Sequence, residues 1–220
     1  MLFERLLIYE DPAPVGAAMN MALDEALLEH CTEPILRFYG WRRPSLSFGY
    51  FGKYGDVAAE AENRELVRRW TGGGSVLHGT DLTYSLVTPA IDPAASQGPP
   101  AIYAALHNAI RAALLAGGKK TKLADAAAPR VSDACFANPV RHDLLLDGRK
   151  IAGAAQRRTR CGFLHQGSIQ LPGLPITFHD LFASALSARA EHAELPPQVL
   201  ERATALAAEK YATEAWLRRW

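Results

Sequence analysis

The chain of 220 residues balances 24 lysines and arginines against 23 aspartates and glutamates, and 49% of its residues are hydrophobic. A net charge of +1 creates no overall field that would attract nucleic acid or an anionic membrane, so we expect neither as a partner. The first residues contain no apolar run long enough for a signal peptide or a membrane span. We therefore expect a cytoplasmic protein. We favour one domain over residues 1–220, although this length also allows two small ones.

Hydrophobic periodicity and the placement of glycine and proline predict the elements of the first half of the chain. We expect strands at residues 6–9, 35–39 and 45–50, and helices at 16–30 and 56–65. A strand at 66–69 then leads into a run of glycines, and another strand follows at 81–89.

The second half begins with a loop at 91–100 and a helix at 101–116, which ends at a pair of glycines. After an irregular stretch, strands at 144–146 and 151–157 flank an Asp-Gly pair typical of a hairpin turn. A strand at 163–171 and helices from 175 onward complete the chain. Runs of strands with interspersed helices, rather than regular βαβ alternation, predict an α+β fold.

The glycine run lies between cationic side chains directly after a predicted strand. Its residues are Arg68, Arg69, Trp70, Thr71, Gly72, Gly73, Gly74, Ser75, Val76, Leu77 and His78. Glycine lets the backbone approach a ligand closely and adopt positive φ, so successive N–H groups can converge on an anion or a carbonyl. The run matches neither a P-loop nor the G-x-G-x-x-G dinucleotide pattern. A flexible turn is the alternative, but charged donors on both sides favour a binding loop.

Lys150 follows the predicted hairpin turn. Period two along its strand predicts that Lys150 shares a face with Ala152 and Ala154, while Gly153 points to the other face. Small neighbours would leave room beside the ammonium for a thin apolar chain and a carbonyl. The alternative is a solvated lysine on a hairpin.

The three cysteines are an odd number in a sequence without an export signal, which favours free thiols. Cys135, in front of Phe136, is either a small buried hydrophobe or a nucleophile. As a nucleophile it needs a nearby cation such as Lys150, because a thiol with a pKa of about 8.5 is mostly protonated at neutral pH. Cys161 lies among arginines and is the rival nucleophile, although we expect it in an exposed turn. Cys31 ends a predicted helix, and we interpret it as structural.

Several segments together resemble the biotin and lipoate protein ligase and octanoyltransferase superfamily. They are residues 19–25, 36–41, 44–51, 68–78, 135–136, 147–156 and 165–168. Their occurrence in the family's order is far more specific than any one of them.

The resemblance implies an α+β fold like the catalytic core of biotin protein ligases and class II tRNA synthetases, with a central mixed β-sheet flanked by helices. It implies catalytic roles for Cys135 and Lys150, with Lys150 near an acyl carbonyl. It implies no metal site. The substrate-binding residues that it implies are Arg68, Arg69, Gly72, Gly73, Gly74, His78, Gly153 and Ala154.

Within this superfamily, transferases take octanoate from acyl carrier protein through a cysteine thioester, whereas ligases activate free lipoate with ATP. Residues 79–85 resemble the transferase pattern and lack the His-Asp-x-Gly-Asn typical of ligases. Cys135 with Phe136 resembles the thiol position of one octanoyltransferase group. Few residues follow the core, so we expect no accessory domain of the kind that ligases carry.

The resemblance therefore favours transfer of an octanoyl or lipoyl group from acyl carrier protein to a lysine of a lipoyl-domain or glycine-cleavage H-type carrier protein, with no cofactor required. The first alternative is a lipoate-protein ligase that uses ATP, magnesium and lipoate. The second is a protein that binds lipoyl domains without chemistry. Two departures from the family pattern bear on the acyl donor: Gly52 and Lys53 replace the usual Gln, and Ala154 replaces a common Ser.

Overall fold

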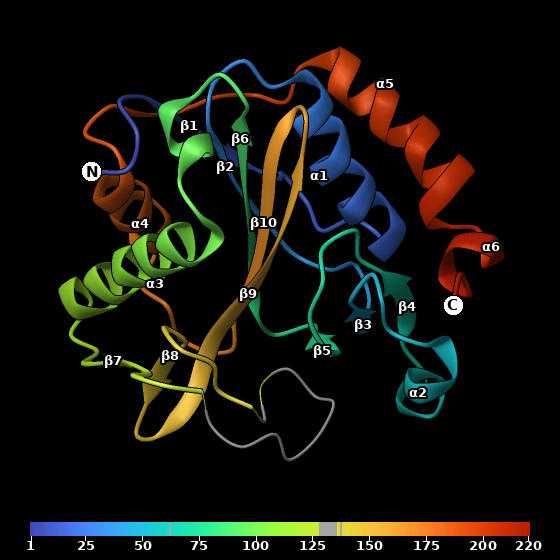
Figure 1. Ribbon diagram of the computed structural model, residues 1–220, viewed down its shortest axis with the longest axis horizontal. Helices are drawn as coiled ribbons and strands as arrows, with labels where there is room; N and C mark the ends of the chain where they lie inside the picture. Colours follow the sequence, from blue (N-terminus) through green and yellow to red (C-terminus); the bar gives the residue numbers. More distant parts are fainter. Residues whose placement is uncertain (62, 128–135, 137) are drawn as a thin grey trace.

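The computed structural model describes residues 1–61, 63–127, 136 and 138–220 (Figure 1). Within these residues the centre of the molecule is an eight-stranded sheet in the order β11-β1-β2-β6-β10-β9-β8-β7. The sheet is mixed, because β1 runs parallel to both neighbours and the other pairs are antiparallel. The strands are β1 Leu6–Glu10, β2 Ile35–Tyr39, β6 Leu82–Pro89, β7 Lys122–Leu123, β8 Leu144–Leu146, β9 Arg149–Thr159, β10 Gly162–Ile169 and β11 Ala190–His192.

A second, three-stranded sheet carries the glycine run. Its order is β4-β3-β5, with β3 at Ser45–Phe48, β4 at Glu65–Arg68 and β5 at Val76–His78. The glycine loop, residues 69–75, therefore connects the two outer strands of this sheet. Figure 1 shows the small sheet beside the lower part of β9 and β10. Nearby lie α2 at Tyr54–Ala58 and a 3-10 turn at Ala59–Ala61.

Helices cover both faces of the main sheet (Figure 1). One face carries α3 at Pro99–Ala116 and α4 at Phe178–Leu186. The other face carries α1 at Ala17–His30 and α5 at Pro197–Leu206. A π-helical turn at Ala207–Tyr211 and α6 at Glu214–Leu217 continue from α5, and a 3-10 turn at Pro93–Ser96 precedes α3.

Because both faces are covered, the central strands are buried along nearly their whole length without alternation. Neighbouring residues enter different cores: Leu86 packs toward α3 and α4, whereas Val87 packs toward α1 and α5. Phe163 and Leu164 on β10 divide in the same way. Helix α1 is buried on most of its circumference, since it lies between the sheet and α5.

The α+β class and the central mixed sheet are confirmed, and the differences are local. The helix expected at 56–65 ends earlier, because the chain turns at 59–61 and enters β4 at Glu65. The loop expected at 91–100 contains a 3-10 turn, and α3 begins at Pro99, where a proline suits the first helical turn. Strands β5, β7 and β11 were not predicted, because two or three residues carry almost no periodic signal.

Two histidines are buried between α3 and the sheet. His165 on β10 is fully buried, and neither of its ring nitrogens has a hydrogen-bond partner among the described residues. Burial lowers its pKa to about 3, and the nearby His107 contributes. Burial also lowers the pKa of His107 to about 4, although its Nδ1–H donates to the carbonyl of His142 at 2.6 Å. Both rings are therefore neutral in the folded protein near neutral pH.

These two pKa shifts predict how stability depends on pH. An unfolded histidine titrates near pH 6.5, so below that pH the unfolded chain binds protons that the folded chain rejects. The free energy of unfolding should fall as the pH drops from about 6.5 toward 4, by up to about 1.4 kcal/mol per pH unit for each histidine. Urea denaturation at several pH values across this range measures the free energy of unfolding. This free energy should depend less steeply on pH for His165→Leu than for the wild-type protein. An equally steep dependence on pH in the variant and the wild-type protein would contradict the assignment.

Candidate functional site

A small pocket lies between the glycine loop and the main sheet. Its walls include small residues of β9 and β10, together with the aromatic side chains of Tyr39, at the end of β2, and Trp41. The lining residues are Met21, Tyr39, Trp41, Ser47, Arg69, Gly73, Val76, His78, Thr83, Gly153, Ala154, Ala155, Gln166, Gly167 and Ser168. Gly73 and Ala154 also line a larger cleft, so the two cavities are adjacent.

Lys150 lies in that larger cleft. Its Nζ is 2.7 Å from Oδ2 of Asp143, and both side chains are almost completely buried. Asp143 is itself held in place, because Tyr103 Oη donates to its Oδ1 and the Val140 N–H donates to its Oδ2 at 2.7 Å. Tyr103 Oη in turn accepts the N–H of Ala154 at 3.2 Å. This chain of contacts fixes the lysine in the cleft next to the pocket.

The face on which Lys150 lies differs from the simple alternation of the strand. Between β8 and β9 the register shifts, because Leu144 pairs with Ala152 while Leu145 pairs with Lys150. This β-bulge adds one residue on β9 and reverses the alternation beyond it. Lys150 therefore packs over Gly153 rather than beside Ala152 and Ala154; a Cβ at Gly153 would lie 2.4 Å from Cε of Lys150. The absence of a side chain at Gly153 provides the space for the lysine.

The glycine loop approaches other backbone closely. A Cβ at Gly49 would lie 2.0 Å from the carbonyl oxygen of Gly73, so only glycine fits at that contact. Gly73 itself has φ +89°, a left-handed conformation that favours glycine. Arg69 stabilises the loop conformation, because its Nη2 donates to the carbonyls of Gly72 at 3.0 Å and Gly74 at 2.8 Å.

Arg68 occupies a different environment from the one implied for a substrate-binding residue. Its guanidinium donates to the carbonyls of Tyr50, Gly52, Trp216 and Leu217. The Trp216 indole N–H donates back to the carbonyl of Arg68 at 3.0 Å. Successive residues of a strand point to opposite faces, so only Arg69 of the two arginines reaches the pocket. Arg68 instead anchors the segment around α6.

His78 lies on the pocket wall within a polar chain. Its Nε2 is 2.7 Å from Ser47 Oγ, and its Nδ1 is 2.8 Å from Asp81 Oδ2. The Trp41 ring stacks on the imidazole with centroids 4.0 Å apart. Burial lowers the pKa of His78, and Arg69 adds to this effect against the opposing influence of Asp81. The imidazole is therefore neutral near neutral pH.

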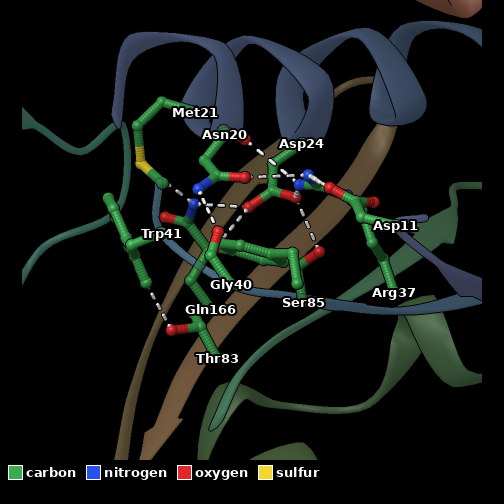
Figure 2. Close-up of polar contacts among 11 residues, drawn as sticks. Asp11, Asn20, Met21, Asp24, Arg37, Gly40, Trp41, Thr83, Ser85 and Gln166 are labelled. Carbon is green, nitrogen blue, oxygen red and sulfur yellow. Dashed lines mark hydrogen bonds and ion pairs between the residues drawn. The ribbon is translucent and has the colours of Figure 1, made fainter. Parts of the chain in front are cut away.

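A buried polar network behind the pocket fixes Gln166 (Figure 2). Arg37, fully buried on β2, contacts Asp24 on α1 at 2.8 Å and Asp11 at 2.5 Å. The other carboxylate oxygen of Asp24 accepts from Gln166 Nε2 at 2.7 Å. Gln166 Oε1 then accepts from Thr71 of the glycine loop at 2.8 Å. The network thereby connects helix α1 to the loop that covers the pocket.

Cys135 lies outside the residues that the structure describes. Phe136, which follows it, has its ring centroid 5.3 Å from Lys150 Nζ. Cys161 is exposed in the turn between β9 and β10, where it was expected. Cys31 follows α1 and is half-buried, and burial raises the pKa of its thiol to about 12. A thiol with so high a pKa is a poor nucleophile near neutral pH.

Several polar residues of the site were not predicted as functional. They are Ser47, Asp81, Tyr103 and Asp143. Asp143 comes close to Lys150 only through the β8–β9 hairpin and its bulge. Asp81 is three residues after His78, a spacing that occurs in many turns. Neither position carries a pattern that separates it from an ordinary surface carboxylate.

Similarity to known proteins places the chain in a family. Residues 16–211 match the lipoyl protein ligase A/B catalytic domain, and the chain belongs to that family. Octanoyltransferase LipM of Oceanobacillus iheyensis is 37% identical over 205 residues, covering 89% of this chain and 74% of that protein. The LipM protein of Geobacillus kaustophilus is 40% identical over 175 residues, covering 70% of this chain and 61% of that protein. The chain thus spans only part of the length of these relatives.

Solved structures share the fold. Ta0514 of T. acidophilum, a candidate lipoate protein ligase, has a TM-score of 0.77 at 21% identity, with 99% of each chain covered. A lipoate-protein ligase A bound with ATP has a TM-score of 0.72 at 23% identity, with 98% of each chain covered. At this level of identity the likeness supports the fold alone.

Two kinds of feature are absent from the described part of the chain. No helix there has the length and apolar character needed to cross a membrane. No group of three or more His, Cys, Asp or Glu side chains there is arranged to hold a metal ion.

Removing Asp24 should destabilise the protein strongly. Asp24→Ala leaves the buried guanidinium of Arg37 with one carboxylate fewer, and breaking a buried pair in this way costs about 3–5 kcal/mol. Glu33→Ala is the matched control, because the Arg5–Glu33 pair is exposed and such pairs contribute at most about 1 kcal/mol. Chemical denaturation of both variants measures the difference. Similar losses of stability in the two variants would show that the buried ion pair contributes no more to stability than the exposed one.

Proposed function

We propose that this protein transfers an octanoyl group, or a lipoyl group, from acyl carrier protein to a lysine of a lipoyl-domain or H-type carrier protein. The observation that carries the proposal is a buried, ion-paired lysine in a cleft adjacent to a largely apolar pocket, in a chain up to 40% identical to octanoyltransferases. Burial of an octanoyl tail there would contribute about 0.8 kcal/mol per CH₂ to binding.

In the proposed reaction the Cys135 thiolate attacks the carbonyl of the carrier-bound thioester. A carbon–sulfur bond to the enzyme forms, and the carrier leaves as its thiolate. The amine of the acceptor lysine then attacks the acyl-enzyme, and the Cys135 thiol is released. Lys150 contributes by donating to the oxyanion of each tetrahedral intermediate, with Asp143 holding its ammonium in place. The position of Phe136 against Lys150 supports this pairing.

The reaction needs neither ATP nor a metal in this proposal. Exchange between two thioesters is nearly balanced, and formation of an amide from a thioester is downhill. The protein therefore has to supply positioning and electrostatic stabilisation only. Arg69, Gly73, His78, Gly153 and Ala154, which line the pocket, would hold the acyl chain.

Incubation with octanoyl-acyl carrier protein without ATP, followed by intact-protein mass spectrometry, tests this function. We expect an octanoyl adduct on the wild-type protein and its loss in Cys135→Ala. Cys161→Ala removes the rival thiol and should keep the adduct. If product forms only with ATP and a free acid, the protein is a lipoate-protein ligase and the transferase proposal is wrong.

Gly153→Ala should impair transfer without unfolding the protein. The added methyl would lie 2.4 Å from Cε and 2.7 Å from Nζ of Lys150, so the lysine must move away from Asp143. A shift of about 1 Å at a reacting group can cost about 10²-fold in rate. Gly55→Ala is the control, because a Cβ there meets no atom within 4 Å. The assay compares the transfer rates and melting temperatures of both variants with those of the wild-type protein. A wild-type transfer rate for Gly153→Ala would contradict the proposed role of Lys150.

A further inference from the structure

Ser47, His78 and Asp81 form a continuous hydrogen-bonded relay, of which Ser47 and His78 line the pocket. Ser47 Oγ lies 2.7 Å from Nε2 of the imidazole, and Asp81 Oδ2 lies 2.8 Å from its Nδ1. Ser47 comes from β3, His78 from β5, and Asp81 from the turn before β6. A nucleophile in contact with a base, which is oriented in turn by a third group, is the arrangement that activates serine in hydrolases.

Asp81 is fixed as the acceptor at the end of this relay. Its Oδ2 also accepts from Ser168 at 2.6 Å and Thr83 at 3.0 Å, and its Oδ1 accepts the N–H of Gly79 at 3.1 Å. Burial opposes ionisation of Asp81, but the hydrogen bonds from His78 and Ser168 leave its pKa below the usual value. An ionised Asp81 requires a proton on Nδ1 of His78. The lone pair of Nε2 is then directed at the hydroxyl of Ser47.

Arg69 provides the charge that an activated serine needs. Its Nη1 donates to Ser47 Oγ at 2.7 Å, so a guanidinium lies where negative charge would develop when the hydroxyl loses its proton. A serine that only stabilised the loop would not need a cation on its oxygen and a neutral base on its proton. Ser47 is fully buried and lines the pocket, which shares Gly73 and Ala154 as lining residues with the cleft of Lys150.

We propose that Ser47 is a second nucleophile of this protein, which gives it an esterase activity toward small acyl esters that is independent of Cys135. Ser47 Oγ bonds to the acyl carbon while His78 Nε2 takes the serine proton, and the ester's alcohol or phenol leaves with that proton. Water then attacks the acyl-serine with His78 as base, releasing the acid and restoring Ser47. The atoms balance with water as the only co-reactant.

Hydrolysis of acetyl, butyryl and octanoyl esters of p-nitrophenol by the Cys135→Ala protein tests this activity. We expect turnover above background for at least one ester, and a fall of at least about 10²-fold when Ser47→Ala is added. Ser45→Ala is the matched control, because Ser45 lies two residues away on the same strand and donates to the carbonyl of Arg43. Turnover that does not depend on Ser47, or no turnover of any ester, would overturn the proposal.

A second measurement needs no substitution in the relay. The Cys135→Ala protein is treated with a fluorophosphonate, which reacts with activated serines, and the modified peptide is identified by mass spectrometry. We expect the adduct on Ser47 in the folded protein and its absence after denaturation. An adduct elsewhere, or none, counts against the proposal even if Ser47→Ala fails to fold. Neither experiment uses a carrier protein, so the result is separate from the success or failure of the transferase proposal.

Discussion

The structure depends on the neutralisation of one buried cation. Arg37 stands in the second strand of the sheet with no exposed surface, and an unpaired charge in that position would prevent folding. Asp24 from α1 and Asp11 from the end of β1 meet its two sides, and Asn20 provides a further acceptor at 3.0 Å (Figure 2). The helix is therefore held on the sheet in one orientation by charge as well as by apolar packing. A buried network of this kind specifies geometry more than it adds stability.

This constraint extends to the pocket through hydrogen bonds. Asp24 orients the amide of Gln166, which accepts from Thr71 and so holds the start of the glycine loop. Arg69 then holds the rest of that loop through two carbonyls. A loop rich in glycine loses much conformational entropy when it becomes ordered, and these hydrogen bonds offset that cost. The loop of this protein is ordered because each of its ends has a fixed partner.

Small residues determine where ligands and side chains can lie. A Cβ at Gly167 would lie 2.3 Å from the ring of Tyr84, and a Cβ at Gly153 would meet Lys150. The first glycine lets an aromatic ring fill the core, and the second lets a charged side chain lie in the cleft next to the pocket. The two proposed reactive centres thus lie in adjacent cavities and use different supports. Lys150 depends on Asp143 and the β8–β9 hairpin, whereas Ser47 depends on the turn that holds Asp81.

The sequence by itself determined the class of fold, the long central elements and the position of the glycine loop, because each depends on a local pattern. Periodicity marks α1, β6 and α3, and the consecutive glycines mark the loop. Only the tertiary structure decided which side chains meet. Neighbouring arginines took different roles, since Arg69 faces the pocket while Arg68 holds the segment at α6. One extra residue in a bulge moved Lys150 to the other face, and Asp143 and Ser47 gained partners 7 and 31 positions away through strand pairing, which no local pattern encodes.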